Sequence, residues 1–450
     1  MPKASNLLLY LYLIMCACML LFDLFSVLRR RFSLRAGEAR QEQWKRYFNE
    51  ICARGGNRPD EEEACRYALL RLVPWFLRPA MKGRGDDEVL YFLLRRLNAL
   101  LEFQGAISWC LDQPSNRYPL IPWVQGKKAV FIRLGERYLN QDSAVRAFYA
   151  YLCRRCLLGG PEPEDPITQN MLYLVTDSSL YCRENSLSAL YAFGGTEAVA
   201  QALVRLSRAG VLHSAKLITD GLLSFHGDRR QLSDVLWEHW EEFLPYYQTA
   251  IVNYLRMSDS RFCDRLLLLL KEEEEDRELR LAIVRYYRKN RYEPARETLQ
   301  KLVRSSPTEG WEFAALAALS LESYPGDDTE KVLKQALSHR NWYVRSNAAE
   351  ALLNLLARPV SELAPDLLPE VSGTARELGD ALRERGWYVS LGRPRRAVAP
   401  DAPALKDVLE GEDRFARDIL RYRLEAFQRE ETGAQRAFEA AWETGKGVRA

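Results

Sequence analysis

A cysteine pair and three evenly spaced histidines are the residues with the most scope for metal chemistry. Cys153 and Cys156 form a C-x-x-C, but a structural zinc site needs a second pair of ligands, and no partner motif follows. His213, His226 and His239 recur at equal intervals, which could bring two imidazoles together but is not a ligand motif. We therefore expect no metal site and interpret the cysteines as partly buried positions on successive turns of a helix.

Motifs for catalysis and cofactor binding are also missing from the sequence. It contains no phosphate-binding loop, no dinucleotide-binding glycine pattern, no G-x-S-x-G and no H-E-x-x-H. The sequence therefore offers no catalytic residue and no cofactor site, and it favours a protein that is not an enzyme.

Repeated cations are the better candidates for a binding surface. They fall on two segments, 294–304 and 328–337, that have the spacing of amphipathic helices. If these helices stack, the cations form a mildly basic stripe suited to an acidic protein segment or to a membrane surface. The alternative is that they are ordinary solvated charges. The candidate partner-binding residues are Arg296, Lys301, Arg304, Lys331 and Lys334.

These residues are positioned by a helical phrase that recurs at a fixed period. The stretch from Trp342 to Leu355 aligns without a gap with the earlier stretch from Leu180 to Phe193. A pair made of a small or aromatic residue and an apolar one recurs between them at steps of 32 or 33 residues, which is typical of stacked helix pairs in which neither helix can bury its apolar stripe alone. We expect an all-α solenoid. The pairs are Ala189-Leu190, Gly221-Leu222, Tyr254-Leu255, Tyr286-Tyr287, Ala318-Leu319 and Ala351-Leu352.

The phrase from Asn341 to Leu352 resembles the HEAT-repeat consensus, and it is most similar to the short bacterial type also seen in phycobilisome-lyase-like proteins. The resemblance covers residues 170–385. It implies a right-handed superhelix of antiparallel helix pairs that binds proteins. It also implies an arginine that hydrogen-bonds between neighbouring units, and the matching positions are Arg183, Arg280 and Arg345. The positions that depart from this pattern are Ala215, Gln248 and Glu312.

The N-terminus predicts a single transmembrane helix. Apolar residues run unbroken from Leu7 to Phe22 and, with Asp23 as the one charge, on to Leu28. This length is about 33 Å as a helix, which spans a hydrocarbon core of about 30 Å. A cleaved signal peptide is the alternative, but no small-residue cleavage pattern follows the run. A cluster of cations after the run predicts, by the positive-inside rule, that the rest of the chain is cytoplasmic. The cluster is Arg29, Arg30, Arg31 and Arg35.

Charge is concentrated beside this run. Residues 29–54 hold eight cations and three acids, a balance of +5, and residues 1–28 are neutral. Since the whole chain carries +3, residues 55–450 carry −2. A nucleic-acid-binding domain is expected to carry a basic surface, so a nucleic-acid partner is not expected here.

Glycine and proline mark the expected boundaries along the chain. The Pro-rich stretch 159–166 reads as a linker, 112–127 as an irregular connection and 385–403 as a loose one. Residues 413–428 predict a final amphipathic helix that caps the stack. The expected regions are a transmembrane anchor (1–28), a basic juxtamembrane helix (29–54), a helical N-terminal region (55–160), the HEAT-like array (167–385) and a loose connection with C-terminal capping helices (386–450).

Two functions fit these patterns. The favoured one is a scaffold or regulator, single-pass in the cell membrane, that uses no cofactor and binds a membrane-associated protein at the cytoplasmic face. The alternative is a helical-repeat enzyme similar to the pigment lyases or to the DNA glycosylases. The first would need a chromophore context that the sequence does not show, and the second conflicts with the charge of −2 on residues 55–450.

Overall fold

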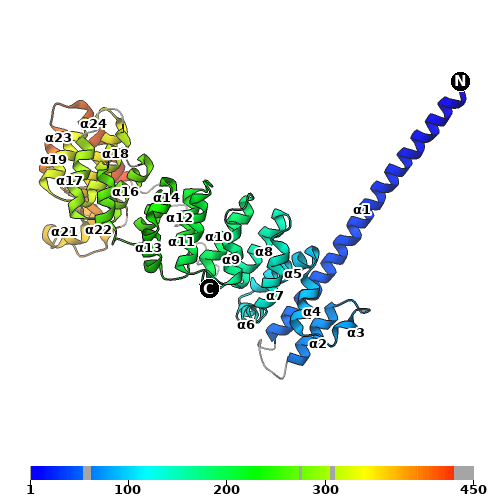
Figure 1. Cartoon of the computed structure of the whole chain (residues 1–450). Helices are drawn as coiled ribbons and strands as arrows, with labels where there is room; N and C mark the ends of the chain where they lie inside the picture. Colours follow the sequence, from blue (N-terminus) through cyan, green and yellow to red (C-terminus); the bar gives the residue numbers. More distant parts are fainter. Residues whose placement is uncertain (1, 54–61, 273–275, 305–309, 393, 430–450) are drawn as a thin grey trace. The chain divides into compact units, whose positions relative to one another are not determined.

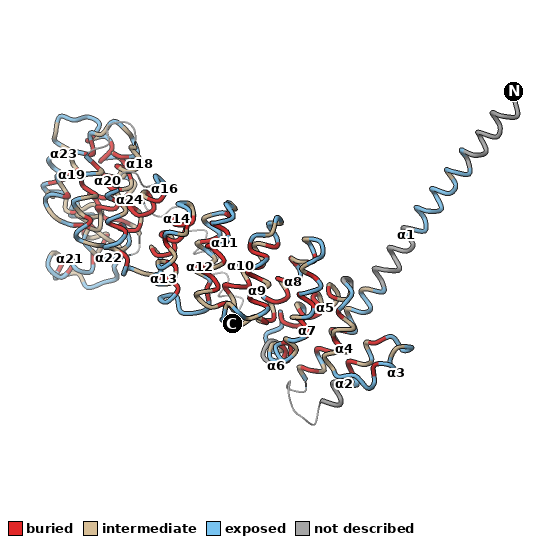
Figure 2. Tube along the Cα trace, in the orientation of Figure 1, coloured by how far each residue is buried: buried red, intermediate tan, exposed pale blue. Residues whose placement is uncertain are grey.

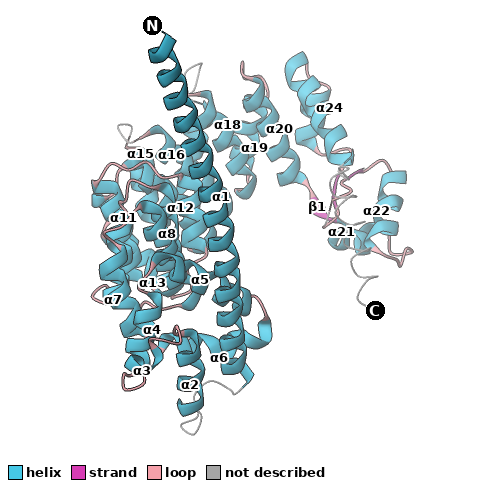
Figure 3. Ribbon diagram, turned by 90° about the vertical axis from the view of Figure 1, so that its right-hand side faces the viewer, coloured by secondary structure: helices cyan, strands magenta, loops and turns pink. Residues whose placement is uncertain are grey.

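The computed structural model describes residues 2–53, 62–272, 276–304, 310–392 and 394–429. Within these ranges the regular secondary structure is helical apart from three strands of two or three residues (Figure 3), so the all-α prediction is confirmed. The chain divides into two compact units, residues 1–243 and 244–450, which we call unit 1 and unit 2.

Unit 1 is built from thirteen α-helices and one short 3-10 helix within its described residues (Figure 1). Several begin at a side chain that caps the free backbone N–H groups, such as Asp165 before α9 and Asp228 before α13. The helices are α1 (Pro2–Ala53), α2 (Glu62–Leu72), α3 (Arg78–Met81), α4 (Asp86–Leu94), α5 (Leu97–Leu111), α6 (Pro114–Gln125), α7 (Lys128–Tyr138), α8 (Ser143–Cys156), α9 (Pro166–Leu174), α10 (Leu180–Phe193), α11 (Thr196–Arg208), α12 (Ala215–Leu223), α13 (Arg229–Glu238) and η2 (Trp240–Glu242).

The first helix is continuous where the sequence predicts an anchor and a separate juxtamembrane helix. Its C-terminal part packs on α5, α6 and α2, because Trp44, Tyr47, Phe48 and Ile51 are all buried there. Its N-terminal part projects from unit 1 (Figure 2), and the described apolar side chains on it are more than half exposed. Those side chains are Tyr12, Ile14, Met15, Met19, Leu20, Leu21, Phe22, Leu24, Phe25 and Val27.

Within the described residues, no helix combines the length and the apolar character that a membrane crossing requires. The side chains at 2–11, 13, 26 and 28–35 lie outside the described part of α1. The predicted topology cluster Arg29, Arg30, Arg31 and Arg35 therefore lies outside it too.

Unit 2 consists of helices in which alternate members pack on each other, since α16 lies on both α14 and α18, and α20 lies on both α18 and α24. The two segments predicted as amphipathic helices, 294–304 and 328–337, form helices at Arg296–Arg304 and Asp327–Ala336. The elements are α14 (Pro245–Ser258), α15 (Cys263–Lys271), α16 (Arg277–Lys289), η3 (Glu293–Ala295), α17 (Arg296–Arg304), α18 (Trp311–Ser320), η4 (Leu321–Ser323), α19 (Asp327–Ala336), α20 (Trp342–Leu356), β1 (Arg358–Pro359), α21 (Val360–Leu367), α22 (Ala375–Glu384), β2 (Tyr388–Val389), β3 (Arg396–Val398), α23 (Pro403–Leu409) and α24 (Arg414–Arg429).

Two segments expected to be irregular are ordered, so both expectations were wrong. Residues 114–125 form α6 despite Pro119 and Pro122 inside it, because Trp123 packs its ring on Tyr47 and Phe48 of α1 at 5.7 and 5.9 Å. Tertiary packing here outweighs the low helix propensity of proline.

Residues 385–403 contribute strands β2 and β3 to a small antiparallel sheet of order β1-β3-β2. This sheet shares a core with α21 and α22, which includes Leu363, Leu382 and Val389. The predicted C-terminal helix is confirmed as α24, which packs on α20 and buries Ile419 and Phe427. Phe415 and Tyr422, also expected to cap the stack, stay exposed.

Candidate functional site

The predicted basic stripe lies on α17 and α19, two helices that pack on each other. Its cations are largely neutralised by acids: Arg296 pairs with Glu293, Lys301 with Glu297, Lys331 with Asp328 and Lys334 with Asp407, at 2.6, 2.8, 3.7 and 3.0 Å. Arg304 ends α17 and is exposed. The five cations lie on adjacent helices, as expected, but the acids paired with four of them cancel most of the positive charge. The role of the stripe in binding a partner therefore remains a prediction, and its electrostatic basis is weak.

Two arginines of the repeat phrase bond to the connection that leads into their own helix. Nη1 of Arg183 donates to the carbonyls of Asp177 and Ser178, and Nη1 of Arg345 donates to those of His339 and Arg340. These carbonyls lie in the connections from α9 to α10 and from α19 to α20, so the expected bond between neighbouring units stays a prediction. Arg280 on α16 lies 5.1 Å from the ring centre of Phe313 on α18, the first helix of the next helix pair.

Asparagines make the cross-helix bonds instead. The Nδ2 of Asn185 donates to Ala147 O of α8 at 3.3 Å, and the Nδ2 of Asn347 donates to Ala315 O of α18 at 2.9 Å. Each bond joins the first helix of one pair to the first helix of the pair before it, α10 to α8 and α20 to α18. The available signal was that asparagine occupies the same place in both aligned phrases.

Among the described residues, no three His, Cys, Asp or Glu side chains are grouped so that they could hold a metal ion. His213 and His226 line one groove of about 650 Å³ between α8, α10 and α12. His213 is buried with its Nε2 3.1 Å from Glu184, and burial lowers its pKa. His239 lies elsewhere, between Glu197 and Glu242.

Cys153 and Cys156 are fully buried, whereas the sequence predicts that they are partly buried. Burial raises the pKa of Cys156 to about 12 and raises that of Cys153 further. Both thiols stay protonated at neutral pH, so neither is a reactive nucleophile.

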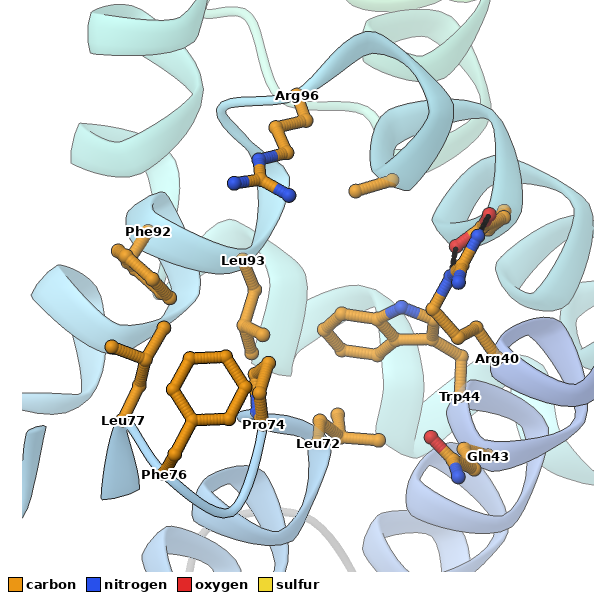
Figure 4. A pocket seen from close by; sticks show the side chains of 12 residues that line it. Arg40, Gln43, Trp44, Leu72, Pro74, Phe76, Leu77, Phe92, Leu93 and Arg96 are labelled. Carbon is orange, nitrogen blue, oxygen red and sulfur yellow. Dashed lines mark hydrogen bonds and ion pairs between the residues drawn. The ribbon is translucent and has the colours of Figure 1, made fainter. Parts of the chain in front are cut away.

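The strongest candidate site in unit 1 is a pocket of about 430 Å³ where α1 joins the other helices. Figure 4 shows the indole of Trp44 facing Leu93 and the ring of Phe76 across this space, with Arg96 extending toward it from the side. Most of the wall is apolar. The lining residues are Arg40, Gln43, Trp44, Leu72, Pro74, Phe76, Leu77, Phe92, Leu93, Arg96, Ala99 and Glu102.

Two arginines give this pocket its charge. Arg40 donates two hydrogen bonds to the carboxylate of Glu102, at 2.8 and 2.7 Å, and this pairing raises the pKa of Arg40. Arg96 is exposed just before α5 and has no acidic partner among the described residues. With one cation paired and one unpaired, the pocket suits an apolar group that carries an acidic end.

The loop between α2 and α3 supplies the exposed side of the pocket. Phe76 on this loop is 63% exposed and its neighbour Trp75 is 78% exposed, with their rings 5.9 Å apart. Large exposed aromatic side chains beside a pocket are typical of a binding surface rather than of a core. The sequence analysis missed this site, although Trp75 and Phe76 between Pro74 and Pro79 indicate an ordered aromatic loop.

No family model matches the sequence, and the curated proteins include no significant match to it.

Proposed function

We propose that this chain is a membrane-tethered, non-enzymatic α-solenoid of the HEAT-repeat type that holds a protein partner at the cytoplasmic face of the cell membrane. The observation that carries the proposal is the double role of α1. One end of this helix exposes apolar side chains, and the other end builds a wall of the pocket through Arg40, Gln43 and Trp44.

The proposed anchor is supported by where the exposed apolar side chains lie on the helix. Successive residues of an α-helix point about 100° apart, so Met19, Leu20, Leu21 and Phe22 face all sides. Each of the four is more than half exposed. A helix that is apolar all round needs an apolar environment, and the run from Leu7 to Leu28, with Asp23 as its one charge, has the length for a bilayer.

The proposed solenoid is supported by the packing of alternate helices. In unit 2 the first helices α14, α16, α18 and α20 pack in sequence order, each on the next. In unit 1 the corresponding contact joins α8 and α10. The asparagine bonds from Asn185 and Asn347 repeat the same contact at aligned positions.

Distance along α1 favours a protein partner over a lipid for the pocket. Trp44 follows Leu28 by about 24 Å along a helix. Headgroups extend only about 5–8 Å beyond the hydrocarbon core. A lipid held in the bilayer could not reach the pocket of an upright anchor, whereas an apolar segment of a cytoplasmic protein could.

Tethering would make a weak pocket sufficient. A partner confined to the same membrane meets the site at a high effective concentration, so modest intrinsic affinity gives high occupancy. The cations Arg29, Arg30, Arg31 and Arg35 set the proposed orientation, with residues 29–450 in the cytoplasm.

Carbonate extraction of membranes tests the anchor. We expect the full chain to stay in the pellet, and the double variant Leu20→Arg, Leu21→Arg to be released, since each arginine costs roughly 2.5–3.5 kcal/mol inside a bilayer. The matched control is Leu20→Ala, Leu21→Ala, which should remain in the pellet. A wild-type chain that is released by carbonate would refute the anchor.

A further inference from the structure

A second groove in unit 1 is formed by α5, α8 and α10, three helices of which α8 packs on both others. It has a volume of about 480 Å³ and lies apart from the α1 pocket, with no lining residue in common. The lining residues are Gln104, Ser143, Ala144, Ala147, Phe148, Tyr151, Ser179, Tyr181 and Asn185. None of the nine is charged, although 28% of the chain's residues are.

Aromatic rings supply the apolar surface of this groove. Phe148 is 40% exposed and Tyr181 is 76% exposed, on neighbouring helices. The same wall includes the small residues Ala144 and Ala147, which leave room for an inserted side chain. Two rings that flank small residues form a slot for one apolar side chain.

A buried amide supplies the specific polar feature. Gln104 is only 9% exposed, and its Oε1 has no hydrogen-bond partner in the described part of the chain. Buried acceptors are normally satisfied, so an unsatisfied one in a groove wall indicates a missing donor. The other amide in the wall is already engaged, since Asn185 donates to Ala147 O.

From these features we infer that the groove binds an extended, uncharged peptide segment of a partner protein. An apolar side chain of the segment packs on Phe148 and Tyr181, and the Gln104 side chain turns its buried Oε1 toward the groove to accept a backbone N–H. This role goes beyond the proposed tether and does not depend on it. A charged side chain would lose its hydration with no countercharge in the wall.

The segment must be extended rather than helical. The interior N–H groups of a helix are already bonded to carbonyls one turn earlier, so they cannot be donated to Gln104. An extended chain has its N–H groups free, and its side chains alternate in direction. One side chain can then enter the slot while the N–H of the next residue donates a hydrogen bond to the Gln104 side chain.

Peptide display against the detergent-purified full chain identifies the occupant directly. We expect the enriched peptides to share a short uncharged run that includes a large apolar side chain. Their binding should fall at least tenfold for Phe148→Ala and Tyr181→Ala. The matched control is Tyr173→Ala, which removes an equally exposed ring of unit 1 (63%) that does not line the groove, and it should bind as the wild type does.

The bond to Gln104 is tested with a backbone ester. Replacing one amide of the enriched peptide by an ester removes a single N–H, and at the correct position we expect about a tenfold loss of affinity. Against Gln104→Leu, whose melting temperature is checked first, the amide and ester peptides should bind equally.

Three results would overturn the inference. They are enrichment of charged peptides, binding that Phe148→Ala and Tyr181→Ala leave unchanged, and no enrichment over the display background. Because detergent-purified protein is used, none of them depends on where the chain resides in the cell.

Discussion

Gly221 allows two helices of unit 1 to approach closely. A Cβ at this residue of α12 would lie 2.2 Å from the Tyr191 ring of α10, too close for any carbon contact. We expect Gly221→Ala to lower the free energy of unfolding by about 1–3 kcal/mol, because the buried ring must shift. Thermal unfolding measures the loss. Gly85→Ala is the matched control, since nothing lies within 4 Å of a Cβ there, and an equal loss in both variants would contradict the explanation.

His239 introduces a pH dependence at the level of a single side chain. Its Nδ1 lies 2.7 Å from Glu242 and its Nε2 lies 3.6 Å from Glu197, and the bond to Glu242 raises the pKa of the imidazole above 6.5. The same bond lowers the pKa of Glu242 below 4.5. The imidazole therefore contributes stability that is complete below pH 6.5 and is lost as the pH rises through its raised pKa. The carboxylate contributes stability above pH 4.5 that is lost as the pH falls through its lowered pKa.

Unfolding midpoints of the wild type and His239→Gln across pH 4 to 9 test this pairing. We expect the wild type to have its largest advantage between pH 4.5 and 6.5, and the advantage to decrease on both sides. A difference that is constant over the whole range would show that the pair of charges is not responsible.

At the scale of elements, the attachment of α1 depends on a cluster of rings. Phe48 is fully buried, and its ring centre lies 5.4 Å from Phe103 on α5 and 5.9 Å from Trp123 on α6. We expect Phe48→Ala to cost about 3–5 kcal/mol of unfolding free energy, because a large cavity would remain. Chemical denaturation measures the change. Tyr173→Ala removes an exposed ring and should shift stability by no more than about 0.5 kcal/mol.

Regular periodicity made the elements of residues 180–356 predictable. Every first helix from α10 to α20 contains the apolar pair that the sequence places in it, because burial on one face requires the spacing of a helical turn. Local signals failed where packing decided the structure. Prolines at 119 and 122 indicate a connection, yet the rings of Tyr47 and Phe48 hold α6 as a helix.

The candidate sites were harder to predict than the elements. The α1 pocket joins residues from 40 to 102, and nothing in the sequence alone places Trp44 opposite Phe76. The pairing of the basic stripe was hidden for a different reason. Its cations were visible in the sequence, but the acids that pair with them, such as Asp407 with Lys334, come from distant segments as well as from the same helix.

In the whole molecule, we propose that α1 both attaches the chain to the membrane and forms part of the binding site. Removing the attachment should then leave the fold of unit 1 intact, because Trp44, Tyr47 and Phe48 remain on the retained part of the helix. We expect a chain that begins at residue 36 to keep the wild-type helical circular dichroism and melting temperature but to leave the membrane fraction. Loss of the folded state in this truncated chain would contradict the separation of roles within α1.

The most direct test of the central claim is the accessibility of the pocket rim in intact cells. Trp75 is 78% exposed beside the pocket, so Trp75→Cys places a reactive thiol there, in a background where Cys16, Cys18, Cys52, Cys65 and Cys263 are serine. A maleimide that cannot cross membranes is then added to intact and to permeabilised cells. We expect the chain to be bound to the membrane and to be labelled only after the cells are permeabilised. Labelling in intact cells, or recovery of the chain in the soluble fraction, would contradict the central claim.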